Sequence, residues 1–232
     1  MIHTQNFGLR QEWVFGWINL LNEKREFTQQ EIENGIGMGP RQTPAFLIWM
    51  KGLGLMEKRG ELFRPTDLFD TYLKKDPKFS SQDTWISMVL KVSQDTFPVS
   101  MVRWFFNNCP KNEEMNQTRF LELFSHAVGK PYAERTLKNG FQTLVDFLKR
   151  TIVGKELGFY DGEKSSFLCH PILPSDSFLT QFISSKIQEE KANRDLGFFL
   201  EDQSKCGGII RVFGEQIRSR VFSCFELVNE DV

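Results

Sequence analysis

The chain has 232 residues, of which 40% are hydrophobic and 25% charged, and its 29 basic and 30 acidic side chains give a net charge of −1. This composition is typical of a globular protein and excludes an intrinsically disordered or membrane-embedded chain. The sequence has no run of about 18 apolar residues, and its first ten residues lack the basic-then-apolar pattern of a signal peptide. We therefore expect a cytoplasmic protein.

Cysteine and histidine are too few and too dispersed to suggest a metal centre. The four cysteines, Cys109, Cys169, Cys206 and Cys224, contain no CxxC pair, and the chain has three histidines. Zinc sites and disulfide frameworks need closely spaced or paired ligands. We therefore expect free thiols, no resident metal and no cofactor.

The first third of the chain has the pattern of a winged helix. Apolar spacing and capping signals predict three helices, at about residues 11–22, 28–34 and 43–51. Thr28 and Glu31 form a capping box for the second helix, while Thr43 and Pro44 suit the start of the third. Two extended runs around Lys58-Arg59-Gly60 follow as a hairpin. This order predicts a winged-helix domain over residues 1–66.

The rest of the chain is predicted to be mainly helical. Between residues 67 and 153, helices are expected at about 66–74, 81–92, 98–106, 116–128 and 133–150. The last two are joined by a turn at Gly129, which resembles a second helix-turn-helix-like unit. Residues 154–232 are predicted to form a C-terminal α+β region. The fold class is thus mainly α (α+β), with a winged helix and a helical bundle.

Both candidate helix-turn-helix units are locally basic. Residues 40–64 contain five basic and two acidic side chains, and residues 130–155 contain six basic and two acidic ones. Such bias is expected where a protein neutralises DNA phosphates, although a solvated surface would look the same. The candidate DNA-binding residues are Arg41, Gln42, Thr43, Lys51, Lys58, Arg59, Arg64, Lys130, Arg135, Lys138 and Asn139. Because residues 44–50 are almost wholly apolar, sequence-independent DNA binding or protein docking fits better than base reading.

A nuclease interpretation has weak candidates near the C-terminus. Asp176, Glu189 and Lys191 superficially match the PD-(D/E)xK pattern, which holds Mg²⁺ or Mn²⁺. Glu189 and Lys191 are two residues apart on a predicted helix, so their side chains point to different sides. A solvated helix face is the favoured interpretation.

Several short motifs resemble a known bacterial family. They are Phe7-Gly8-Leu9-Arg10, Gly37-Met38-Gly39, the run from Trp49 to Glu57, Pro65-Thr66, Trp104-Phe105-Phe106-Asn107 and the run from Glu134 to Lys138. Together they resemble a domain-of-unknown-function family of DNA phosphorothioation gene clusters, which includes the SspB component. The resemblance covers most of residues 7–150.

The resemblance implies membership of a modification and anti-phage defence module that replaces a non-bridging phosphate oxygen of DNA with sulfur. SspB-type components are associated with DNA nicking, but no nuclease motif of this sequence supports that activity. Where the family suggests basic side chains on the third helix, this chain has Pro44 and Leu47. That departure shifts the expected DNA contacts to Lys58, Arg59 and the second unit.

We therefore expect a DNA-binding accessory protein of a phosphorothioation or related defence system. Its expected partners are duplex DNA and other proteins of that system, with no membrane. Three alternatives stay open: a metal-dependent nickase, a scaffold that uses aromatic surface to hold partner enzymes, and a transcription regulator.

Overall fold

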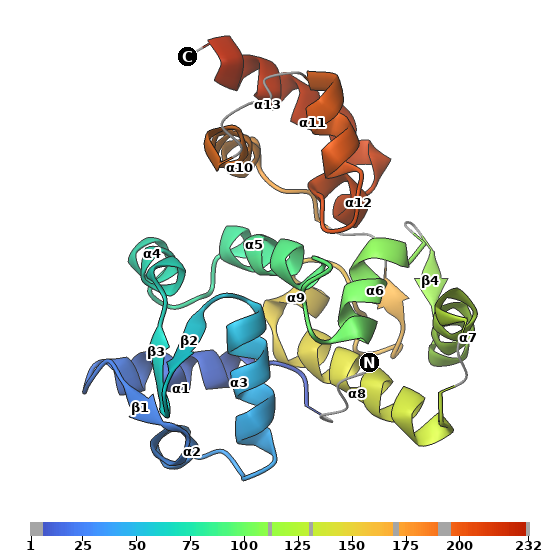
Figure 1. Cartoon of the computed structure of the whole chain (residues 1–232). Coiled ribbons are helices and arrows are strands. Elements are labelled where there is room, and N and C mark those ends of the chain that lie inside the picture. The colour runs from blue at the N-terminus through green and yellow to red at the C-terminus, as the bar shows by residue number, and fades with distance from the viewer. Residues whose placement is uncertain (1–6, 111–112, 130–131, 169–171, 190–195, 231–232) are drawn as a thin grey trace.

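The computed structural model describes residues 7–110, 113–129, 132–168, 172–189 and 196–230. These residues form a mainly helical fold with a three-stranded and a two-stranded antiparallel sheet. In Figure 1 the N-terminal elements and the middle elements lie side by side, and the C-terminal helices form a separate layer above them. The expected mainly helical class with a small β component is confirmed.

Six elements make up the N-terminal unit. They are α1 (Gln11–Leu21), β1 (Phe27–Thr28), α2 (Gln29–Ile36), α3 (Gln42–Gly52), β2 (Met56–Arg59) and β3 (Leu62–Pro65). The strands form an antiparallel sheet in the order β1-β3-β2, with Phe63 paired to both Phe27 and Lys58. The predicted hairpin is therefore present, while the pairing of β1 with its outer edge was not predicted.

Local signals set most boundaries of the N-terminal unit. Thr28 and Glu31 form the predicted capping box, and Gly37 ends α2 in the left-handed region at φ 74°. The predicted start of the third helix is wrong by two residues, because α3 begins at Gln42 with Arg41 as its N-cap. The side chain of Thr43 makes no cap and turns into the protein instead.

Eight elements make up the middle of the chain. They are α4 (Asp67–Lys75), α5 (Gln82–Val92), α6 (Ser100–Asn108), β4 (Glu114–Met115), α7 (Gln117–Val128), α8 (Glu134–Arg150), α9 (Ile152–Lys155) and β5 (Phe167–Leu168). All five predicted helices are present. β5, which lies beyond residue 153, pairs antiparallel with β4.

The N-terminal and middle units repeat one order of elements. Each has a helix, a two-residue strand, a capped helix that ends at a left-handed glycine, and a third helix, namely α1-β1-α2-α3 and α6-β4-α7-α8. In the second unit the Asn116 side chain accepts a hydrogen bond from the backbone of Arg119, and Gly129 has φ 62°. In each unit the short strand then pairs with a strand that follows the third helix.

The C-terminal elements are α10 (Asp176–Glu189), α11 (Leu196–Gln203), α12 (Ile209–Phe213), a 3-10 turn (Glu215–Ile217) and α13 (Arg218–Glu230). After β5 the described residues contain helices and no strand, so the expected α+β character of this region is limited to β5 itself. Residues 209–230 are helical apart from Gly214. The layer touches the middle unit where the backbone N–H of Gly207 donates to Asn107 Oδ1 at 2.8 Å.

Aromatic side chains fill the interior, as the high phenylalanine content predicts. Trp17, Trp49 and Trp85 are essentially fully buried. Trp49 stacks on Phe147 with ring centroids 4.7 Å apart, which joins α3 to α8 across the two units. Among the described residues, no helix is long and apolar enough to span a membrane.

Candidate nucleic-acid interface

The outer face of α3 carries a cation near each end. Arg41 and Lys51 are exposed, and neither forms an ion pair within the described part of the chain. Pro44 and Ile48 lie between them on the same face and are half-buried. The face can therefore offer two charges to a phosphate backbone but little hydrogen bonding to base edges.

Two of the sequence candidates on α3 have structural roles. Thr43 is completely buried, and its hydroxyl donates to Glu33 Oε2 at 3.1 Å and to the Gly39 carbonyl at 3.3 Å. The side-chain oxygen of Gln42 accepts from the Gly39 backbone N–H at 3.0 Å. Both side chains fix the turn before α3, and the buried Thr43 cannot reach a ligand surface.

The hairpin of β2 and β3 presents cations that already have acidic neighbours. Lys58 lies 3.5 Å from Glu61, and Arg59 lies 3.3 Å from Glu57. Arg64 also bonds to Glu57 and is half-buried. Exposed pairs of this kind contribute little stability, so a phosphate can replace the carboxylate at Lys58 or Arg59. Arg64 instead links β3 to Glu57 of β2.

The second unit presents its candidates at the start of α8. Arg135 is exposed and makes no ion pair with a described residue. Lys138 is exposed and lies 2.7 Å from Glu134, whose pKa it lowers through their hydrogen bond. Asn139 is half-buried, and Lys130 lies outside the described residues. The first two turns of α8 thus form a short polar tip on a helix whose second half is core.

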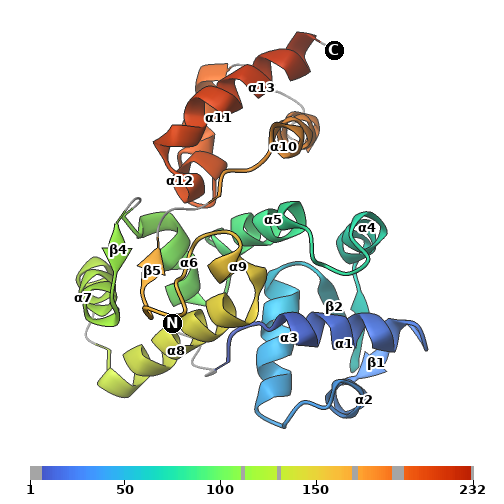
Figure 2. The same cartoon turned by 180° about the vertical axis from the view of Figure 1, so that it is seen from behind.

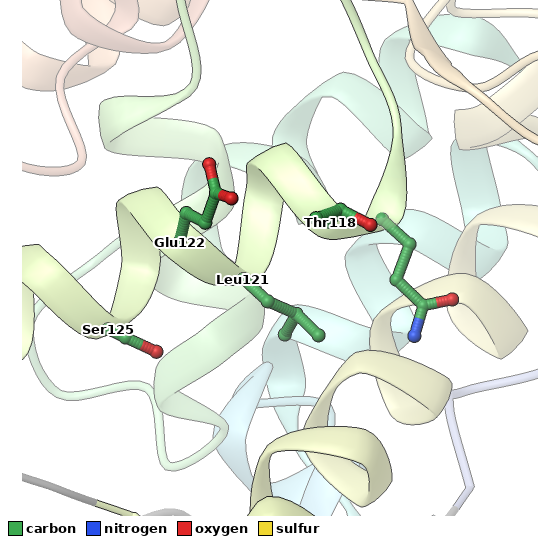
Figure 3. Close-up of a pocket in the computed structure, with 5 residues that line it drawn as sticks. Thr118, Leu121, Glu122 and Ser125 are labelled. Atoms are coloured by element: carbon green, nitrogen blue, oxygen red, sulfur yellow. The ribbon is translucent and has the colours of Figure 1, made fainter.

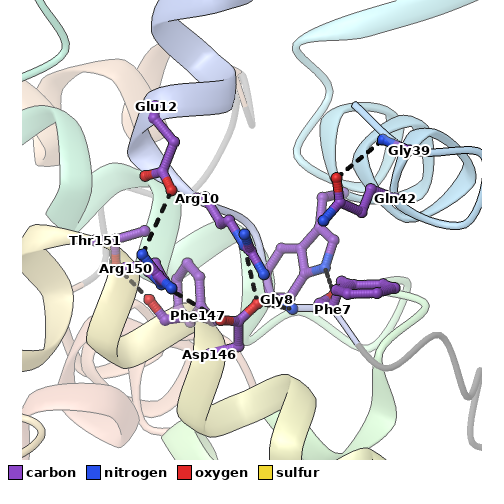
Figure 4. Close-up of polar contacts among 11 residues, drawn as sticks. Phe7, Gly8, Arg10, Glu12, Gly39, Gln42, Asp146, Phe147, Arg150 and Thr151 are labelled. Atoms are coloured by element: carbon purple, nitrogen blue, oxygen red, sulfur yellow. Dashed lines mark hydrogen bonds and ion pairs between the residues drawn. The ribbon is translucent and has the colours of Figure 1, made fainter. Parts of the chain in front are cut away.

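A half-buried carboxylate, Asp146, joins the two units, and the sequence did not reveal it. Asp146 Oδ2 accepts hydrogen bonds from the Gly8 backbone N–H at 3.1 Å and from Arg10 Nε at 3.2 Å. Arg150 lies 3.8 Å from Asp146 Oδ1 on the other side (Figure 4). Asp146 and Arg10 are 136 positions apart, so no local pattern reveals the pair. The available signal for this contact was the presence of an acidic residue, Asp146, on the largely apolar second half of α8.

The nuclease candidates do not fit a metal centre. Asp176 Oδ1 accepts from both Nε and Nη2 of Arg220, at 2.9 and 2.6 Å. Asp176 and Glu189 are the first and last residues of α10, so their backbones lie about 20 Å apart along the helix. Lys191 lies outside the described residues, and no group of three His, Cys, Asp or Glu among the described residues could hold a metal ion.

A hollow on α7 adds no ligand site to the second unit. It is lined by Gln117, Thr118, Leu121, Glu122 and Ser125 (Figure 3). All five residues belong to one helix, so no second wall encloses a ligand. Its single charged residue, Glu122, lies 3.7 Å from Arg119.

Comparisons with known proteins show a shared fold. No protein-family model and no curated protein sequence matches the chain. A solved structure with a similar fold is described as the magnesium ion-bound crystal structure of SspB. The TM-score is 0.66 over 98% of this chain and 77% of the SspB chain, at 12% sequence identity. The expected resemblance to SspB is thus confirmed at the level of the fold.

Proposed function

We propose that this protein binds duplex DNA through two winged-helix-like units, as an accessory protein of a phosphorothioation or related defence system. The first unit spans the elements α1 to β3, and the second spans α6 to β5. The C-terminal helices form a third part. The shared fold with SspB supports the system, and the chemistry of the two third helices supports the ligand.

One observation carries the proposal. Arg41 and Arg135 each lie at the N-terminal end of the third helix of a unit, Arg41 as the N-cap of α3 and Arg135 as the second residue of α8. Both are exposed, and neither has an acidic partner within the described part of the chain. In helix-turn-helix proteins this end of the recognition helix approaches the DNA. Two unneutralised guanidinium groups, one at the start of each third helix, favour phosphate contacts made by both units together.

The binding is expected to depend weakly on sequence. The outer face of α3 is apolar between its terminal cations, and the tip of α8 offers only the half-buried Thr136 and Asn139 beside its charges. Contacts to phosphates position a protein on DNA, whereas base-edge hydrogen bonds specify the sequence. This distinguishes the proposal from a transcription regulator, which predicts a defined operator footprint.

The proposal assigns no metal and no nicking activity to this chain. The SspB structure is described as magnesium-bound, but the acidic candidates here lie at opposite ends of α10 and one of them already bonds to Arg220. A DNA-binding role needs neither a bound metal ion nor these acidic side chains.

Fluorescence anisotropy with a labelled duplex across a salt series tests the proposal. The variants are Arg41→Ala/Lys51→Ala and Arg135→Ala/Lys138→Ala. Each double variant should flatten the plot of log affinity against log salt by about 2, because each lost phosphate contact removes about 0.9 from the slope.

The matched control is Lys74→Ala/Lys205→Ala, which removes two exposed lysines outside both units. Its salt slope should equal that of the unmodified protein. Absence of duplex binding at low salt would reject the proposal and favour a winged helix that docks partner proteins. An equal loss in the control would show that only total charge matters.

A further inference from the structure

A cleft separates the C-terminal layer from the rest of the protein. Its walls are α4 and α5 on one side and α10 on the other, and its volume is about 430 Å³. Figure 2 shows α10 lying over α4 and α5 without other elements between them. Small-molecule sites have volumes of about 300–1,000 Å³ and favour the boundary between two parts of a fold, so size and place both suit a ligand.

Each wall contributes an aromatic ring that is supported by contact with a second, more buried ring. Tyr72 of α4 lines the cleft and packs edge-to-face on the fully buried Phe79, with centroids 6.4 Å apart and an interplanar angle of 71°. Phe182 of α10 lines the opposite wall and stacks on the largely buried Phe178 at 6.1 Å and 11°. Both supported rings are half-buried and can hold a flat ring between them.

Three lysines from different elements line the same cleft. They are Lys75 at the end of α4, Lys91 at the end of α5 and Lys186 in the last turns of α10. Because they belong to both walls, an anion between α5 and α10 can meet cations on either side. A planar ring that carries an anionic group matches this lining.

Two aspartates also line the cleft. Asp76 is 8% exposed, and its two oxygens accept hydrogen bonds from the backbone N–H groups of Ser80 and Ser81 at 3.0 and 2.9 Å. Burial raises the pKa of the Asp83 carboxyl. Three lysines against two aspartates leave the lining with a net positive charge.

We propose that this cleft binds a nucleoside monophosphate unit, with its base between Tyr72 and Phe182 and its phosphate near Lys75, Lys91 and Lys186. The unit is either a free nucleotide or one nucleotide of an unpaired DNA strand, and only the DNA form of the proposal rests on the proposed DNA-binding function. The cleft lies in neither winged-helix-like unit, so its ligand is additional to the duplex.

Isothermal titration calorimetry of the full chain with dAMP tests the cleft. Saturable binding is expected, and Lys75→Gln/Lys91→Gln should weaken it at least about tenfold by removing two charge-assisted contacts. Phe182→Leu keeps the apolar volume but removes the ring, and should also weaken binding about tenfold. The matched control is Lys74→Gln/Lys78→Gln, two neighbouring exposed lysines that do not line the cleft, and it should bind dAMP normally.

Competition with DNA identifies the source of the nucleotide. If a duplex with an unpaired 3′ tail displaces dAMP and a blunt duplex does not, the natural ligand is an unpaired strand. If neither displaces dAMP, the ligand is a free nucleotide, and the site still stands. No saturable heat with dAMP up to about 10 mM, or an equal loss in the control pair, would overturn the proposal.

The same titration separates this proposal from the duplex proposal. Arg41→Ala/Arg135→Ala should weaken binding of a blunt duplex and leave dAMP binding unchanged. The cleft variants should weaken dAMP binding and leave binding of a blunt duplex unchanged. If only the duplex result fails, the duplex proposal is rejected; if only the dAMP result fails, the cleft proposal is rejected.

Discussion

Replacement of Asp146 by alanine tests the contact that joins the N-terminal segment to α8. The carboxylate accepts from Gly8 at 3.1 Å and from Arg10 at 3.2 Å, and its side chain is 12% exposed. Asp146→Ala leaves a backbone N–H without its acceptor and a guanidinium without its carboxylate. Both groups are held in place by neighbouring packing, since Arg10 lies over the ring of Trp13 at 4.8 Å.

The expected cost follows from these contacts. A hydrogen bond to a charged group contributes about 1.5–3 kcal/mol, but the Arg10 side chain is 18% exposed, so water can partly replace the lost partner. We expect Asp146→Ala to lower the free energy of unfolding by about 2–3 kcal/mol. Asp146→Asn keeps one carbonyl oxygen and should cost about half as much.

Urea denaturation followed by circular dichroism measures the difference. Glu12→Gln is the matched control, because Glu12 is exposed and lies 3.9 Å from Arg150; it should cost less than about 0.5 kcal/mol. A loss below about 1 kcal/mol for Asp146→Ala, or an equal loss in the control, would show that Asp146 does not join the units as described.

Three other changes test separate parts of the structure. Gly8→Ala should destabilise the protein by about 2 kcal/mol or more in urea denaturation, because the new Cβ would lie 2.1 Å from the backbone nitrogen of Phe147; an unchanged midpoint would contradict this close approach. Burial and then the neighbouring Asp95 raise the pKa of Cys206 to about 11. At about pH 8 the Cys206 thiol should therefore react with iodoacetamide about 100-fold more slowly than a free cysteine. Asp95→Asn should speed the reaction. A rate equal to that of a free cysteine in the unmodified protein would disprove the raised pKa. Thr66→Ala removes a hydroxyl that caps α4 and donates to the Gly54 carbonyl at 2.6 Å. The change should lower the free energy of unfolding by about 1–2 kcal/mol and so lower the thermal midpoint. An unchanged thermal midpoint would refute this role.

Local signals predicted the helices well because their causes lie within a few residues. The Thr28 capping box, the left-handed glycine after α2 and the apolar face of α1 all act over one or two turns. The hairpin of β2 and β3 is equally local. The two-residue strands β1, β4 and β5 are too short to leave a periodic pattern, and they form only because a distant strand offers hydrogen bonds.

The candidate sites depended more on tertiary structure. The sequence marked Thr43 as a DNA-binding candidate because it stands at the start of the predicted third helix, but the fold turns its side chain toward Glu33. Asp176 and Glu189 matched a nuclease spacing, although a helix holds them far apart. The cleft of Tyr72 and Phe182 joins residues more than 100 positions apart, and such pairs carry no signal in one sequence.

Helix α8 belongs to the second unit and also contacts the N-terminal segment, which has a consequence for how the protein would lie along DNA. Its 17 residues extend about 25 Å, with Arg135 at one end and the Asp146 contact to the N-terminal segment near the other. The single helix α8 therefore sets the distance between the two units. We expect a protected stretch of fixed length on the duplex, rather than two short stretches with variable spacing.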